Sequence, residues 1–147
     1  MEELSIGYDF ADYVLEDGKI CAILIVRKEN MESIRVAIKT DGFDSLYHEQ
    51  IRLSAESEMI MNYGDYGNRK TKVLKSGEIL TIEADSEYLQ GDRIELIPKV
   101  WSGKTEVLSL QRNQGIPIYR GKMEIVKANQ GLLLINELLF SEILLYT

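Results

Sequence analysis

With 147 residues, this chain has the length of one domain and can bury roughly two thirds of the surface of its unfolded state. Its 24 acidic and 17 basic residues leave a formal charge of −7. This balance argues against non-specific binding to nucleic acid, which needs clustered Lys and Arg side chains. One Cys and one His exclude an internal disulfide, a thiolate metal cage and a multi-His zinc site, so we predict no metal and no cofactor.

The first 33 residues are predicted to form an N-terminal arm and a first strand. Residues 20–26 are a continuous apolar run, typical of a strand covered on both faces, and Cys21 within it is interpreted as a buried small hydrophobe. Residues 9–17 have too little periodicity to assign and suit a short helix or an arm. The start, Met1-Glu2-Glu3, does not resemble a secretory signal. No apolar run approaches the roughly 18 residues of a membrane span, so we predict none.

The central part of the chain consists of short apolar or alternating runs separated by turn residues, the pattern of strands. Residues 32–40 alternate, with Ile34, Val36 and Ile38 on one face. Past that run, His48 is interpreted as a surface or partly buried hydrogen-bonding residue. Further strands are predicted at 50–55, 59–63, 71–75, 78–84 and 93–98. The pair 71–75 and 78–84 is predicted to form a hairpin across Ser76-Gly77.

Three more strands, at 105–110, 122–127 and 132–136, are predicted before the pattern changes at Asn136. From there an almost wholly apolar run suits a short helix capped by Asn136 or Ser141. Glu137 and Glu142 would be offset by about 140° around that helix and would not face one substrate. We therefore predict a single, mainly β domain over residues 1–147: an antiparallel β-sandwich or barrel-like fold with a short C-terminal helix.

The densest cluster of long polar side chains comprises Arg112, Asn113, Gln114, Tyr119 and Arg120. Binding sites for small molecules combine a few placed polar groups with aromatic surface, so these five residues are candidate glycan contacts. The alternative is that the Gly-Ile-Pro sequence at 115–117 makes a tight loop whose backbone groups are satisfied by the polar side chains. We favour this structural interpretation.

Catalytic signatures are missing from the sequence. A lone Cys and a lone His occur without any local motif, and no Gly-rich phosphate loop is present. Acidic residues are abundant, and Glu83, Asp85 and Glu87 could share one face of an extended stretch. Three spaced acids on one strand are weak evidence for a calcium site, which needs several convergent oxygens. We predict no catalytic and no metal-binding residue.

Two segments carry a family resemblance. Residues 112–121, Arg-Asn-Gln-Gly-Ile-Pro-Ile-Tyr-Arg-Gly, are similar to a family motif Arg-Ser-Gln-Gly-x-Pro-x-Tyr-Arg-Gly. Residues 130–138, Gln-Gly-Leu-Leu-Leu-Ile-Asn-Glu-Leu, are similar to Gly-Leu-x-Leu-Val-Asn-Glu-Leu. With weaker matches from residue 34 onward, residues 34–147 resemble the N-terminal region of the stage II sporulation protein D and amidase enhancer family, which acts on bacterial peptidoglycan.

The resemblance implies a location in the cell envelope or outside the cell. Some members of the family are lytic transglycosylases, whose catalytic Glu lies in a Val-Pro-Ser-Glu-Met-Pro motif. That motif is expected after Thr147, so no catalytic residue is transferred to this sequence. Ser141 and Ile143 also depart from the family's Glu-Glu-Tyr pattern near the expected junction.

From this resemblance we expect a non-catalytic β-rich region that supports cell-wall glycan cleavage, or binds peptidoglycan or a hydrolase partner. Two alternatives are open. One is an independent glycan-binding module that uses the polar cluster at 112–120. The other is a lytic transglycosylase-type enzyme, either in a full-length form or with an acid such as Glu137.

Overall fold

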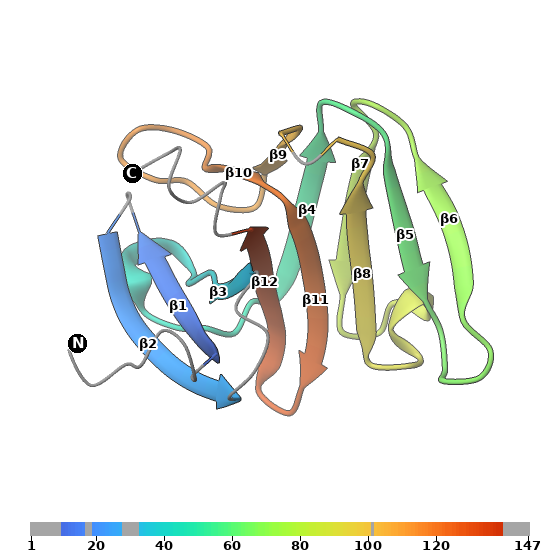
Figure 1. Ribbon diagram of the computed structural model, residues 1–147, viewed down its shortest axis with the longest axis horizontal. Helices are drawn as coiled ribbons and strands as arrows, with labels where there is room; N and C mark the ends of the chain where they lie inside the picture. The colour runs from blue at the N-terminus through green and yellow to red at the C-terminus, as the bar shows by residue number, and fades with distance from the viewer. Residues whose placement is uncertain (1–9, 17–18, 28–32, 101, 140–147) are drawn as a thin grey trace.

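The computed structural model describes residues 10–16, 19–27, 33–100 and 102–139, and in these ranges the chain forms two β-sheets (Figure 1). The larger sheet has the order β2 (Lys19–Arg27), β1 (Phe10–Glu16), β3 (Ser33–Ala37), β12 (Gly131–Leu139), β11 (Lys122–Ala128), β8 (Arg93–Pro98), β5 (Met59–Tyr63) and β6 (Lys70–Leu74). The smaller sheet has the order β10 (Ile118–Arg120), β9 (Lys104–Val107), β4 (Gln50–Ala55) and β7 (Ile79–Glu83). Two short 3₁₀ turns, η1 (Asp41–Phe43) and η2 (Glu87–Leu89), lie in connections.

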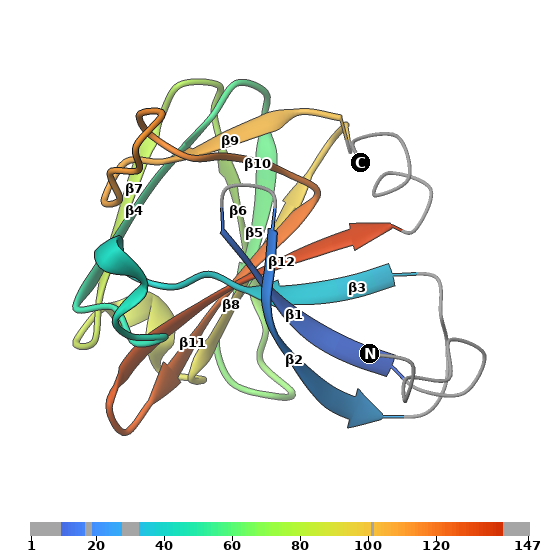
Figure 2. The same cartoon turned by 90° about the vertical axis from the view of Figure 1, so that its left-hand side faces the viewer.

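Neighbouring strands pair antiparallel, apart from the parallel pair β1 and β3. The mainly β, sandwich-like class predicted from the sequence is therefore confirmed. In Figure 2, β4 and β7 run along the left of the view and β9 and β10 cross its top, while β3 and β12 extend to the right.

Alternation along the strands places the apolar core between the two sheets. On β8, Ile94 and Leu96 face inward, and they pair in register with Ile125 and Met123 of β11. All four side chains are fully buried. Full burial of one such side chain contributes about 1.5–3 kcal/mol, so this alternation is the main determinant of which face of each strand points inward.

The smaller sheet supplies the opposite layer of the core. Its inward side chains are Ile51 and Leu53 on β4, Leu80 and Ile82 on β7, and Val107 on β9. The predicted strands 50–55, 59–63 and 93–98 coincide with β4, β5 and β8. The proline Pro98 lies at the end of β8, as its missing N–H requires.

The predicted hairpin across Ser76-Gly77 is wrong. The strand β6 pairs with β5 in the larger sheet, whereas β7 pairs with β4 in the smaller one, so this turn carries the chain from one layer to the other. Gly77 takes a positive φ of 81° and its N–H donates to the Ala55 carbonyl, and the Ser76 hydroxyl donates to the Glu56 carbonyl. Leu74 and Leu80 can then enter the same core from opposite sheets.

The predicted C-terminal helix is also wrong where the structure describes it. Residues 136–139 continue β12, which pairs with β11 on one side and β3 on the other. Two flanking strands satisfy the backbone of this segment, and the side chains of Leu132, Leu134 and Asn136 alternate into the core. Residues 140–147 lie outside the described ranges.

Near the N-terminus the structure contains more strand than expected. Residues 10–16, which had no assigned periodicity, form β1 and pair with β2 across a short connection. The predicted apolar strand at 20–26 lies within β2. The interpretation of Cys21 as a buried hydrophobe concerns a side chain outside those that the structure describes.

Candidate functional site

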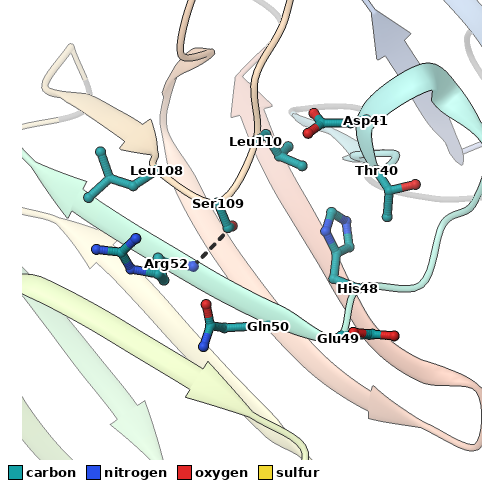
Figure 3. A pocket seen from close by; sticks show the side chains of 9 residues that line it. All are labelled: Thr40, Asp41, His48, Glu49, Gln50, Arg52, Leu108, Ser109 and Leu110. Carbon is teal, nitrogen blue, oxygen red and sulfur yellow. Dashed lines mark hydrogen bonds between the residues drawn. The ribbon is translucent and has the colours of Figure 1, made fainter.

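An open groove of about 520 Å³ lies along the start of β4 (Figure 3). One wall runs from the η1 turn into β4, and the other is the segment that follows β9. The lining residues are Thr40, Asp41, His48, Glu49, Gln50, Arg52, Leu108, Ser109 and Leu110. Hydroxyl, amide, guanidinium and carboxylate groups surround a small apolar surface, a mixture suited to a polar ligand with hydrogen-bonding groups.

Backbone hydrogen bonds hold the two walls together beside β4. The Leu108 N–H donates to the Arg52 carbonyl at 2.7 Å, and the Arg52 N–H donates to the Ser109 hydroxyl at 3.1 Å. Arg52 alternates with the inward Ile51 and Leu53, so its side chain projects to the outer face of the smaller sheet. Its guanidinium therefore borders the groove while its backbone holds the opposite wall.

The floor of the groove includes His48, whose side chain is buried. The ring Nε2 lies 2.7 Å from the Ile38 carbonyl, which can only accept, so Nε2 carries the proton and donates. The backbone of His48 exchanges two hydrogen bonds with Leu132, which ties this loop to the start of β12. The hydrogen-bonding role predicted for His48 is confirmed, and its burial is deeper than expected.

Burial lowers the pKa of His48 below its ordinary value of 6.5, and the positive charge of Arg112 lowers this pKa further. The hydrogen bond to the Ile38 carbonyl raises the pKa, but by less than burial lowers it. The unfolded chain then binds more protons than the folded one at mildly acidic pH, so folding stability falls as pH falls below about 6.5. Urea unfolding at pH 7.5, 6.5 and 5.5 measures this slope. We expect a His48→Gln variant to have a flatter profile between these values.

The contribution of carboxylates to folding stability is lost in a lower and separate pH range. Burial alone would raise the pKa of Glu95, but its hydrogen bond to Lys122 and nearby cations bring that pKa below 4.5. The stability that depends on Glu95 is therefore lost only as pH falls below about 4.5. An identical slope above pH 5.5 in wild type and in the His48→Gln variant would show that another group causes the effect.

The five residues proposed as glycan contacts do not line this groove. Arg112 is buried, and its guanidinium donates to the Lys39 carbonyl at 2.6 Å, the Thr40 carbonyl at 3.1 Å and the Asp41 carboxylate at 3.2 Å. Asn113 and Gln114 are exposed at the tip of a turn that is closed by hydrogen bonds between the backbones of Arg112 and Gly115. Arg112 therefore joins this turn to the segment that forms one wall of the groove.

Tyr119 and Arg120 lie apart from that turn, on β10. Tyr119 is half-buried and packs against the core, and Arg120 pairs in register with Lys104 on β9. The five predicted residues therefore lie in three different places: Arg112 is buried, Asn113 and Gln114 are at the exposed tip of a turn, and Tyr119 and Arg120 are on β10.

Sequence reasoning did not identify the residues that line the groove. The alternation of 50–55 does place Gln50 and Arg52 on the outer face of a strand. The approach of the segment 108–110 to these two residues depends on pairing between β4 and β9, for which no local signal exists.

In the described ranges, no group of three or more His, Cys, Asp and Glu side chains is placed to hold a metal ion. The same part of the chain contains no helix long and apolar enough to cross a membrane. Comparison of this chain with known protein families, with curated proteins and with solved structures found no match.

Proposed function

We propose that this chain is the non-catalytic, β-rich region of a peptidoglycan-acting protein of the stage II sporulation protein D and amidase enhancer type. Its role in this proposal is to hold the glycan strand and so to support cleavage of the cell wall, in the envelope or outside the cell. The proposal starts from the resemblance of residues 112–121 and 130–138 to that family.

One structural observation supports treating these two segments as one unit. The Asn136 amide, from the second segment, donates to the Arg120 carbonyl at 2.6 Å and to the Lys122 carbonyl at 3.1 Å. These carbonyls flank Gly121, which ends the first segment and has a positive φ of 85°. Asn136 is buried, so its two hydrogen bonds satisfy carbonyl groups that would otherwise be costly to bury. Asn136 of the second segment thus holds the backbone at the end of the first segment.

The same framework supports one wall of the groove. Arg112, the first residue of the first motif, holds the carbonyls of Lys39 and Thr40 and the carboxylate of Asp41, and Asp41 also accepts from the Gln111 N–H at 2.8 Å. The motif residues therefore shape the groove, and its lining residues supply the ligand contacts. Gln50 and Arg52 present an amide and a guanidinium, groups that can hydrogen-bond sugar hydroxyl and N-acetyl oxygens.

Co-sedimentation of the purified chain with isolated peptidoglycan sacculi tests the proposal. We expect the wild-type chain to pellet with sacculi, and a Gln50→Ala/Arg52→Ala double variant to bind roughly tenfold more weakly, since two hydrogen-bonding groups are lost. The Arg52 backbone still bonds Leu108 and Ser109 in this variant, so the wall is kept. Lys127→Ala, which removes an exposed cation at β11, is the control and should bind as wild type.

Two outcomes would contradict the proposal. A wild-type chain that stays in the supernatant would remove peptidoglycan contact. Release of anhydro-muropeptides from the sacculi by the pure chain, detected by mass spectrometry, would show that the region is catalytic. If that activity were lost in a Glu137→Gln variant, Glu137 would be its acid.

A further inference from the structure

The ring of His48 presents a polar atom to which the described part of the chain supplies no partner. His48 is the only histidine of the sequence, and it is 3% exposed. Its Nε2 atom donates to the Ile38 carbonyl, so the neutral ring carries no proton on Nδ1, and that atom can only accept. Among the residues that the structure describes, none donates a hydrogen bond to Nδ1. Buried polar atoms are almost always paired, so this acceptor requires an explanation.

The orientation of the ring places Nδ1 at the groove. The two ring nitrogens lie on opposite sides of the imidazole, and Nε2 is directed at Ile38, which precedes the η1 wall. In Figure 3 the ring stands between Thr40 on one side and Ser109 and Leu110 on the other, with one ring nitrogen on the side of Ser109 and Leu110. Hydrogen bonds of Nε2 and of the residue 48 backbone fix this orientation and leave Nδ1 for a ligand.

Burial distinguishes His48 from the other polar residues of the groove. The partly or fully exposed ones are Thr40, Asp41, Glu49, Gln50, Arg52 and Ser109. Water can solvate the polar atoms of those side chains in the free protein, whereas it has little access to His48. A ligand that supplies a donor to Nδ1 therefore removes the cost of a buried unpaired acceptor, and a ligand without that donor leaves the cost in place. This difference makes His48 a determinant of specificity.

We propose that Nδ1 of His48 accepts a hydrogen bond from an N–H or O–H group of the ligand in the groove. The proposal rests on the proposed function, which makes the groove the glycan site, and it names the ligand group that the site recognises. In an N-acetylated sugar the donor is the acetamido N–H or a hydroxyl. The Ser109 hydroxyl, which accepts from the Arg52 N–H, keeps its own proton to donate to an acetamido or hydroxyl oxygen of the same ligand.

The surroundings of His48 keep the ring neutral at pH 7.5. Burial and the charge of Arg112 lower the pKa of His48, the Asp41 carboxylate raises it, and the net result is a pKa below 6.5. Glu49 and Arg52 also line the groove, and the residue of β12 that pairs with position 48 is an uncharged leucine. Protonation of Nδ1 would turn the acceptor into a donor, so this contact is lost as pH falls through the pKa of His48.

His48→Gln is the decisive variant. Its amide N–H can replace Nε2 as the donor to Ile38, but it has no acceptor at the position of Nδ1. We expect it to bind sacculi and the N-acetylglucosamine tetramer about tenfold more weakly at pH 7.5, the loss for one hydrogen bond to a buried acceptor. His48→Asn, which places an amide oxygen near the position of Nδ1, should bind more tightly than His48→Gln although it loses the bond to Ile38. Lys127→Ala should bind as wild type.

The single histidine also permits a direct measurement on the wild-type chain. The NMR spectrum of imidazole nitrogens contains one residue, so no assignment is needed. Saturation with the N-acetylglucosamine tetramer should move the Nδ1 resonance toward that of a protonated nitrogen. It should also lower the pKa of His48 further, because the ligand binds the neutral ring. A histidine that only holds the Ile38 carbonyl would show neither change.

The outcomes separate this proposal from the proposed function. If wild type and His48→Gln pellet equally with sacculi, His48 is not a ligand contact, and the proposed function stands. A wild-type chain that binds neither sacculi nor the tetramer would overturn both. A larger loss in His48→Gln for the N-acetylglucosamine tetramer than for the corresponding glucose tetramer assigns the contact to the acetamido N–H, and equal losses assign it to a hydroxyl. If His48→Gln does not fold, the Nδ1 resonance and the pKa of the wild type decide.

Discussion

Replacement of Glu124 by Gln is expected to lower the free energy of unfolding by about 2–3 kcal/mol, one of the two largest effects that we predict. The substitution keeps the shape of the side chain but removes a negative charge that contacts Arg35, Arg93 and Lys122, of which Lys122 also contacts Glu95. Arg35 and Lys122 are less than one fifth exposed, so water compensates them poorly. Arg93 is more exposed, which keeps the loss below that of a wholly buried ion pair. Urea unfolding measures the change.

Glu106→Gln is the matched control, because Glu106 is an exposed acid at the centre of β9. It should stay within about 0.5 kcal/mol of wild type. A Glu124→Gln variant as stable as this control would show that the three cations do not need the carboxylate.

Replacement of Arg112 by Ala is expected to cost about 3 kcal/mol of folding stability, because it leaves the carbonyls of Lys39 and Thr40 without their donor in a half-buried loop. The same change should lower the binding of sacculi by each folded molecule less than the Gln50→Ala/Arg52→Ala double variant does, since Arg112 supports one wall of the groove but does not line it. Urea unfolding and co-sedimentation of the folded fraction give the two readouts. Arg112→Lys should recover part of the stability.

Asn113→Ala is the control for this substitution, because Asn113 is exposed at the tip of the same turn. We expect it to change the stability by no more than about 0.5 kcal/mol. The opposite combination, an Arg112→Ala variant of wild-type stability that no longer binds sacculi, would make Arg112 a ligand contact. The glycan-contact interpretation of residues 112–120 would then replace the structural one.

The strands that could be predicted well are those whose own side chains alternate or form short apolar runs. For 50–55 and 93–98, inward Ile and Leu residues at every second position define both the strand and its buried face. Residues 10–16 lack this pattern, and their pairing with β2 and β3 makes them a strand. Residues 136–139 have helical composition, yet pairing with two neighbours overrides that local preference.

The candidate site was less accessible to prediction than the fold. Arg112 could be identified as a residue that holds a loop, because the Gly and Pro residues after it indicate a tight turn. Its acceptors lie more than 70 residues away in the chain, so the sequence could not name them. The groove was missed for the same reason, since its walls meet through hydrogen bonds between residues 52 and 108–109.

The sequence by itself determined the mainly β class, most of the strands and the face that each strand buries. It also carried the family resemblance, which the proposed function extends. These properties depend on residues close to one another in the chain, whose period and turn chemistry can be read directly. Only the tertiary structure decided which sheet receives each strand, as in the crossing at Gly77 between β6 and β7. It also assembled the groove and the charged network around Glu124, because long-range pairing places side chains from distant strands within hydrogen-bonding distance.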